Sequence, residues 1–255
     1  MSSPPVAGGQ ATSVGFEAAL GAVDGVEGWL TTAQARRLFE RAGGARRIVE
    51  IGSFRGRSAI VLALGAPEDA EVTAIDPHAG NDRGPREIEG TAEEGEADSR
   101  AFRTNLERAG VADRVRHVRL PSQGALGEVA GELDLLYVDG AHRFGPARDD
   151  LHDWGERLRP GGSLLVHDAF SSVGVTLAIA RLFLAGGEFR YLGRSGSLAE
   201  YRKMRLTSGQ RLLNAARQLG ELPWFARNLV VKLALVLGLR QVARLLGHRE
   251  GPWPY

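Results

Sequence analysis

Residues 48–58 read Ile48-Val49-Glu50-Ile51-Gly52-Ser53-Phe54-Arg55-Gly56-Arg57-Ser58. The first part is β-branched and apolar, which is typical of a buried parallel strand. The two glycines allow a tight turn and a close approach of a ligand to the backbone. The apolar run 59–64 then predicts a helix whose first N–H groups face a polar ligand. Together these features predict the strand–loop–helix of a nucleotide-type site in an open α/β sheet, with an ordinary tight turn as the alternative.

The spacing of the glycines indicates which ligand would bind. The pattern is Glu50-x-Gly52-x-x-x-Gly56, and Phe54 occupies the position where the dinucleotide fingerprint needs its middle glycine. An acid just before the first glycine suits a cationic ligand better than a diphosphate. A second predicted strand, 72–76, ends in Asp76, where an acid can hydrogen-bond ribose hydroxyls.

The alternation of strands and helices continues along the chain. Further strands are predicted at residues 114–118, 133–138, 163–167, 189–192 and 198–201, with helices between most of them. This pattern predicts an α/β fold, a Rossmann-like, doubly wound and mostly parallel sheet with an antiparallel last strand. A helical C-terminal extension follows the sheet.

Composition narrows the class of protein. The chain has 255 residues, 43% of them hydrophobic, a net charge of +1 and no cysteine. The lack of cysteine excludes thiolate metal sites and disulfides, and fits a cytoplasmic protein. The near-neutral charge disfavours nucleic acid as a partner. We expect a disordered tail at 1–13, one catalytic domain at 14–205 and the helical extension at 206–255.

The extension has its own character. Residues 226–246 are strongly apolar, but Lys232 and Arg240 interrupt them, so the run is too short and too charged to span a bilayer. Three alternatives stay open for residues 206–250: packing on the domain as a helical cap, a homodimer interface, or peripheral contact with a membrane.

Polar residues follow the predicted strands. In an open α/β sheet ligands bind outside the carboxyl ends of the strands. Four strands end there with groups capable of chemistry: Gly52-Ser53, Asp76, Asp139 with His142, and Asp168. We therefore place the candidate site at this edge.

Residues 48–179 resemble the catechol O-methyltransferase-like branch of the class I S-adenosylmethionine-dependent methyltransferases. The segment 137–142, Tyr-Val-Asp-Gly-Ala-His, is also similar to bacterial methyltransferases with a V-D-G-x-H signature. The resemblance implies S-adenosylmethionine as cofactor and Asp139 and Asp168 as ligands of a divalent cation such as Mg²⁺. The cofactor-binding residues it implies are Glu50, Gly52, Ser53, Gly56, Ser58, Asp76, Ser122, Gln123 and Asp139.

Two positions depart from that branch. Ala169 stands where the branch has a further metal-binding asparagine, and His142 where it has a lysine general base. An imidazole can accept a proton near neutral pH or bind a metal, so both roles stay open for His142. Strand alternation predicts that His167 points away from Asp168 and is structural, with an inward turn of the chain at this position as the alternative. The Gly- and acid-rich segment 77–99 is predicted to be a loop, either a lid or a solvated insertion.

The function expected from these features is methyl transfer to a small-molecule hydroxyl, with His142 and Asp139 as catalytic residues. One alternative is a nicotinamide-dependent oxidoreductase, which Phe54 and the lack of a Tyr-x-x-x-Lys pair disfavour. Another is a non-catalytic nucleotide-fold protein with a membrane-associated tail.

Overall fold

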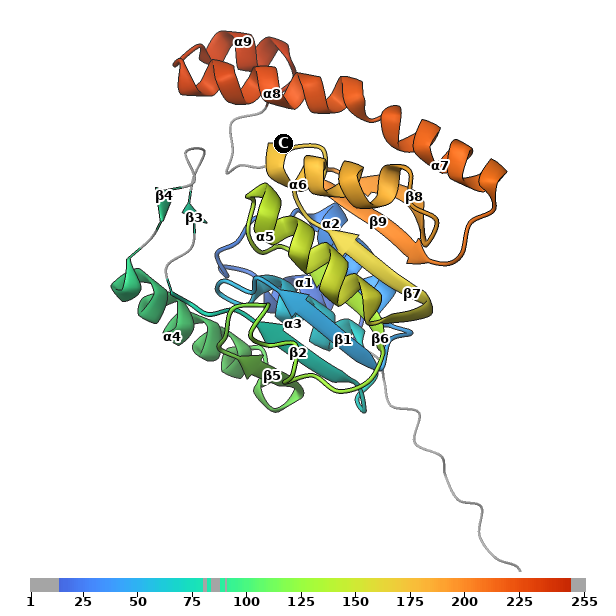
Figure 1. The fold of residues 1–255 in the computed structure, drawn as a ribbon. Coiled ribbons are helices and arrows are strands. Elements are labelled where there is room, and N and C mark those ends of the chain that lie inside the picture. The colour runs from blue at the N-terminus through green and yellow to red at the C-terminus, as the bar shows by residue number, and fades with distance from the viewer. Residues whose placement is uncertain (1–13, 80–81, 84–87, 90, 249–255) are drawn as a thin grey trace, which may run out of the picture.

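A seven-stranded sheet forms the centre of the protein (Figure 1). The computed structural model describes residues 14–79, 82–83, 88–89 and 91–248. The strands run in the order β5 (Val115–Val118), β2 (Glu71–Ile75), β1 (Arg47–Ile51), β6 (Leu133–Val138), β7 (Leu158–Val166), β9 (Leu198–Lys203) and β8 (Phe189–Ser195). The strands β5, β2, β1, β6 and β7 are parallel, whereas β9 runs antiparallel to both neighbours. The predicted fold class, with its antiparallel last strand, is confirmed.

Helices cover both faces of the sheet. On one face lie α1 (Phe16–Ala22), α2 (Thr32–Ala42), α3 (Arg57–Gly65) and α4 (Ala92–Arg108); on the other lie α5 (Phe144–Asp149) with its π-helical continuation η2 (Asp150–Trp154), and α6 (Val173–Ile179) with η3 (Ala180–Leu184). A short turn η1 (Ala112–Arg114) precedes β5. Successive strand residues point to opposite faces of the sheet. Ile48 therefore packs in the hydrophobic core under α2 and α3, and Val49 packs in the core under α5 and α6.

The register of the central strands aligns their carboxyl ends. Ile51 pairs with Ile75 on one side and with Val138 on the other. The ladder continues past the strands, because Gly52 N–H donates to the Ile75 carbonyl at 2.9 Å and Asp139 N–H to the Ile51 carbonyl at 2.8 Å. The residues that follow these strands therefore meet at one edge of the sheet.

The expectation of a loop over 77–99 is wrong for its second half, because α4 begins at Ala92. The Thr91 side chain accepts from the Glu94 N–H, and the Glu94 carboxylate accepts from the Thr91 N–H, which caps the helix at both groups. Glu93 and Glu94 also lie in the first turn, where acids favour a helix. The acidity that suggested a solvated loop thus belongs to a helix start. Before it, β3 (Asp82–Arg83) pairs with β4 (Ile88–Glu89), and much of the predicted lid lies outside the described residues.

Three helices follow the sheet: α7 (Ser208–Leu219), α8 (Leu222–Val236) and α9 (Arg240–Leu245). Figure 1 shows α7 and α8 running along one side of the domain, with α9 folded back on α8. The Asn214 side chain joins α7 to β8, accepting from the Tyr191 N–H at 2.7 Å and donating to the Phe189 carbonyl. No helix among the described residues is long and apolar enough to cross a membrane. The predicted tail at 1–13 lies outside the described residues, and the domain boundary at 205 stays a prediction.

Candidate active site

A carboxylate locks the glycine loop between β1 and α3. The Asp76 carboxylate accepts from the backbone N–H groups of Ser53 and Phe54, each at 2.9 Å, and of His78 at 2.8 Å. Asp76 is buried, and these three donors leave about one of the roughly four acceptor positions of its carboxylate open. The acid predicted for the ribose therefore lies at the site, and it also fixes the shape of the loop.

Glu50 lies beneath this loop with its side chain fully buried. Neither carboxylate oxygen has a hydrogen-bond partner of good geometry among the described residues, and the hydroxyl of Ser53 has none either. Burial raises the pKa of Glu50 to about 8, with Asp139 and Asp76 adding to the effect, whereas the hydroxyls of Ser58 and Ser53 favour the ionised form. A buried acid without partners is a cost to the fold, which a cationic ligand would relieve.

Two glycines let the loop pass close to its neighbours. Gly52 and Gly56 have φ of 85° and 87°, a region that other residues rarely adopt. A Cβ on Gly52 would lie 2.2 Å from the carbonyl oxygen of Asp139. A Cβ on Gly56 would lie 3.1 Å from the ring of Phe102, on α4. The lack of a side chain at Gly52 therefore allows the ends of β1 and β6 to lie this close together.

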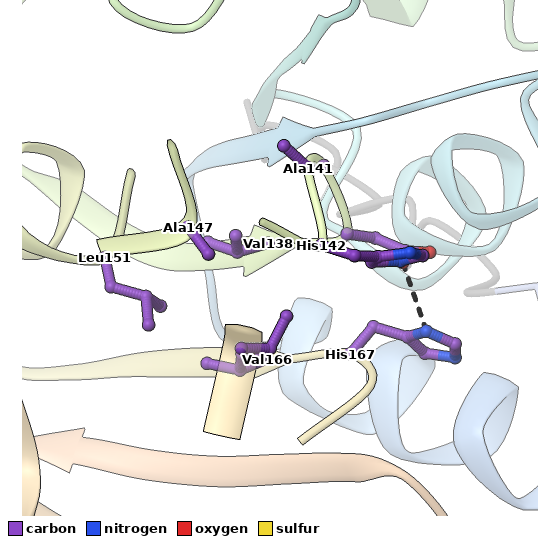
Figure 2. A pocket seen from close by; sticks show the side chains of 10 residues that line it. Val138, Ala141, His142, Ala147, Leu151, Val166 and His167 are labelled. Carbon is purple, nitrogen blue, oxygen red and sulfur yellow. Dashed lines mark ion pairs between the residues drawn. The ribbon is translucent and has the colours of Figure 1, made fainter. Parts of the chain in front are cut away.

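Two acids and two histidines meet at the ends of β6 and β7. His142 Nε2 lies 2.9 Å from Asp168 Oδ2, and His167 Nδ1 lies 3.1 Å from Asp139 Oδ1 and 3.6 Å from Asp168 Oδ2. The hydroxyl of Tyr137 donates to Asp139 Oδ2 at 2.9 Å. Figure 2 shows His142 and His167 lining one pocket beside Val138 and Val166, with the ion pair to His167 dashed.

The pKa values in this cluster shift as paired charges should. Burial lowers the pKa of His142, but its hydrogen bond to Asp168 and the nearby carboxylates outweigh that effect, so the pKa is raised. Burial likewise opposes a charge on His167, yet Asp139 and Asp168 hold its pKa well above the usual range. Conversely, burial favours the neutral form of Asp168, but the two histidines hold its pKa well below the usual range. The carboxylates of the cluster thus favour the protonated forms of both imidazoles.

The expectation that His167 faces away from Asp168 is wrong. Asp168 has φ of 53°, a left-handed conformation that ends the strand alternation. Both side chains consequently face the cluster. The sequence gives a weak signal for this turn, since Asp is one of the few residues that tolerate positive φ.

The donor set is compatible with a divalent cation. One ligand atom each from Asp139, His142 and Asp168 lie within 4.8 Å of one another, and all three residues are half-buried. Such an ion would compete with protons for the imidazole of His142, whose pKa the nearby carboxylates raise. Ala169 is buried and offers no donor, so an ion here would have at most three protein ligands from this group.

Ser122 and Gln123 lie at a second part of the same edge, after β5. Their side chains both donate to Asp150 Oδ1, Gln123 at 3.3 Å. Burial raises the pKa of Asp150 to about 6, although the two donors favour its ionised form. A Cβ on Gly140 would contact the other Asp150 oxygen at 3.4 Å, so Asp150 lies under the loop that carries Asp139.

Sequence reasoning missed Asp150 and Tyr137 as parts of the site. Asp150 lies at the start of the π-helical segment η2, a local irregularity that often occurs at functional sites. Nothing in the hydrophobic periodicity indicates such a segment. Tyr137 reads as an apolar strand residue, and only its partner Asp139 two positions later marks it.

Comparison with known proteins gives consistent matches. Residues 49–169 match a family described as a methyltransferase domain. The chain is 34% identical over 125 residues to a catechol O-methyltransferase of Mycobacterium tuberculosis, which covers 49% of this chain and 48% of that protein. Among solved structures, the cofactor-bound Rv0187 from MTB is 25% identical with a TM-score of 0.53, covering 75% of this chain and 89% of that one. An O-methyltransferase from Bacillus cereus, in complex with SAH, is 21% identical with a TM-score of 0.54, covering 74% and 90%.

The extent of these matches differs between sequence and structure. The chain spans about half the length of the catechol O-methyltransferase it matches. The matched family region contains Glu50, Asp76, Asp139, His142 and Asp168, and ends before α7. These matches support the methyltransferase interpretation and not the nicotinamide or non-catalytic alternatives.

Proposed function

We propose that this protein is a class I S-adenosylmethionine-dependent methyltransferase of the catechol O-methyltransferase-like type, which transfers the methyl group of S-adenosylmethionine to a hydroxyl of a small molecule. The match of residues 49–169 to a methyltransferase-domain family and the likeness to a catechol O-methyltransferase support this proposal. The observation that carries the proposal is the buried Glu50 beneath the glycine loop, whose carboxylate has no hydrogen-bond partner of good geometry among the described residues. It lies at the same sheet edge as a histidine–aspartate cluster. The first supplies a place for a cationic cofactor, and the second supplies proton transfer.

The loop residues would hold the cofactor. Glu50 would face the cationic methionine end, with Ser53 and Ser58 beside it, while Gly52 and Gly56 admit the ligand to the backbone. Asp76 would take the ribose, and Ser122 and Gln123 would border the adenine, as the resemblance implies. Asp139 follows β6 next to Gly52 and would complete the pocket.

His142 would act as the base on the acceptor. When bound, S-adenosylmethionine would supply the methyl group to the hydroxyl oxygen and leave as S-adenosylhomocysteine, and the imidazole of His142 would take the proton that the hydroxyl loses. Asp168 holds His142 at 2.9 Å and stabilises its protonated form. Positioning acceptor and donor in line supplies much of the acceleration. The relative in Mycobacterium tuberculosis is named for catechol, so catechol is the first acceptor to try.

Asp139 and Asp168, with His142 as a third donor, would hold a divalent cation when one is present. Two carboxylates favour Mg²⁺, and an added imidazole favours a transition metal. When bound, the ion would lower the pKa of the acceptor hydroxyl.

Calorimetric titration with S-adenosylmethionine and, separately, with NAD⁺ tests the proposal. We expect a micromolar Kd for S-adenosylmethionine, about −8 kcal/mol, and no heat with NAD⁺. Because the pKa of Glu50 is raised to about 8, its ionised form is scarce at pH 7 and predominates at pH 9. A cationic ligand favours that form, so affinity should rise about tenfold between these pH values.

Glu50→Gln is the matched control, because it keeps the shape of the side chain and cannot ionise. Any change of affinity with pH that remains in the variant comes from titration of the ligand itself. The difference between the pH dependences of the variant and the unmodified protein comes from Glu50. The stability of the free protein should depend on pH in the opposite direction. Neutral Glu50 stabilises the fold below its unfolded pKa of about 4.5, and this stabilisation is lost as the pH rises toward the folded pKa of about 8. NAD⁺ binding without S-adenosylmethionine binding would refute the proposed function.

Metal binding is a separate expectation. Titration with Mn²⁺, followed by the loss of the free-ion electron paramagnetic resonance signal, should reveal one site that Mg²⁺ competes for. Asp168→Asn should weaken it at least about tenfold, whereas Asp150→Asn, a buried acid outside the cluster, should not. Because ligand imidazoles must lose their protons, affinity should increase with pH. Absence of saturable Mn²⁺ binding would leave His142 and Asp168 as a metal-free pair.

A further inference from the structure

The arm, defined as α7, α8 and α9, presents an apolar outer face. Three of its leucines are among the most exposed large hydrophobic residues that the structure describes: Leu212 (76% exposed), Leu237 (61%) and Leu245 (87%). Leu219, Leu222, Val230, Leu233 and Val242 are also exposed. A soluble surface rarely gathers so many large apolar side chains on one element without a partner.

The spacing along α8 places these side chains on one stripe. Leu222, Ala226, Val230, Leu233 and Leu237 follow one another at intervals of three or four residues, so they share a helix face. The opposite face is already used, because Val231 and Ala234 are buried against Ala243 of α9. The arm is therefore two-sided, and its outer side has no described element upon it.

The arm is also cationic. Residues 206–255 carry seven Lys and Arg and only two Asp and Glu, whereas the whole chain carries 32 and 31. Residues 222–248 contain no acid at all. Helical geometry puts Arg211 and Arg217 on the two sides of the Leu212–Leu219 stripe, and Lys232 on the edge of the α8 stripe. Arg240 and Arg244 on α9 are exposed.

This charge decides between two occupants. In a two-fold dimer through α8 and α9, the cationic segment 222–248 would pack against the same segment of a second copy. This segment has no acid, so nothing within it would offset the repulsion between the two sets of positive charges. An anionic lipid surface supplies both an apolar layer for the stripe and negative headgroups for the flanking cations. We propose that the arm lies in the interface of an anionic lipid bilayer, with its outer face toward the acyl chains. It lies on the membrane and does not cross it.

The arm is joined firmly to the rest of the protein. The Asn228 side chain donates to the Phe170 carbonyl at 3.1 Å, two residues after Asp168. Trp224 and Phe225 pack against the hydrophobic core on the face of the sheet that α5 and α6 cover. Glu221 accepts from the Tyr191 hydroxyl at 2.8 Å and from Arg194 at 2.7 Å. Binding through the arm would thus hold the whole domain at the bilayer.

Sedimentation of the full chain with vesicles tests this. We compare phosphatidylcholine vesicles with vesicles of phosphatidylcholine and phosphatidylglycerol in equal parts. We expect roughly tenfold stronger partitioning to the anionic vesicles. Leu233→Glu should lower that binding about tenfold, whereas Leu192→Glu, an exposed leucine on β8 outside the arm, should change it less than twofold. Arg240→Glu with Arg244→Glu should remove the preference for anionic lipid.

Thermal melting and the S-adenosylmethionine titration confirm that each variant is folded, so a failure of the arm proposal is distinct from a failure of methyl transfer. Equal binding to both vesicle types, or none, would overturn the proposal. So would a dimer in light scattering that Leu233→Glu dissociates, since a second copy would then cover the stripe.

Discussion

Replacing His142 with glutamine should lower the rate of methyl transfer by about two to four orders of magnitude, the range of a lost general base. Affinity for S-adenosylmethionine should stay within about threefold, because His142 belongs to the acid–histidine cluster and not to the glycine loop. Single-turnover assays with the best acceptor of a hydroxyl screen that starts with catechol would measure the rate. His152→Gln, an exposed histidine on η2, is the matched control and should be neutral.

The pH profile separates a base from a residue that only shapes the site. A base works when deprotonated, so the rate should rise with pH through the pKa of His142. Asp168 raises that pKa above its usual value near 6.5. In His142→Gln this limb should vanish, leaving a flat, slow rate. An intact limb in the variant would show that another group takes the proton. Unchanged rate but weakened Mn²⁺ binding would instead make His142 a metal ligand only.

The predictable parts of this protein are those fixed by local pattern. The run of β-branched residues and glycines at 48–58 gives β1, its loop and α3, and the alternation of strands and helices gives a mostly parallel sheet with right-handed crossovers. The order of the strands comes from the structure. The gathering of Asp76, Asp139 and Asp168 at one edge follows from parallel topology alone, since all carboxyl ends of such strands meet there.

The unpredictable parts depend on backbone details that periodicity does not encode. One left-handed residue, Asp168, brings His167 into the site, and a π-helical segment places Asp150 beneath the β6 loop. At 92–99, glutamates read as solvated loop while they in fact begin a capped helix. In each case the sequence shows that the residues are polar. The direction in which their side chains point depends on one or two backbone dihedral angles. Roles of individual residues in binding and catalysis stay predictions for the experiments above.

Gly52→Ala should be the most damaging conservative change at the loop. The new Cβ would lie 2.2 Å from the Asp139 carbonyl oxygen, and φ of 85° would strain any L residue. Left-handed strain costs about 1–2 kcal/mol. Separating the β1 and β6 ends adds to this, for a total loss of about 3–5 kcal/mol in the free energy of unfolding.

Gly110→Ala separates these two causes. Gly110 has φ of 69°, but a Cβ there would meet nothing within 4 Å, so it carries the strain without the clash. Denaturant unfolding of both variants should therefore give a loss of about 1–2 kcal/mol for Gly110→Ala and a clearly larger one for Gly52→Ala. Calorimetry should show S-adenosylmethionine affinity lowered about a hundredfold in Gly52→Ala, because Gly52 lies between Glu50 and Asp139 and any shift misaligns both. Equal losses of stability in the two variants would mean that the loop does not pack against Asp139 as described, and would remove the basis for one continuous site.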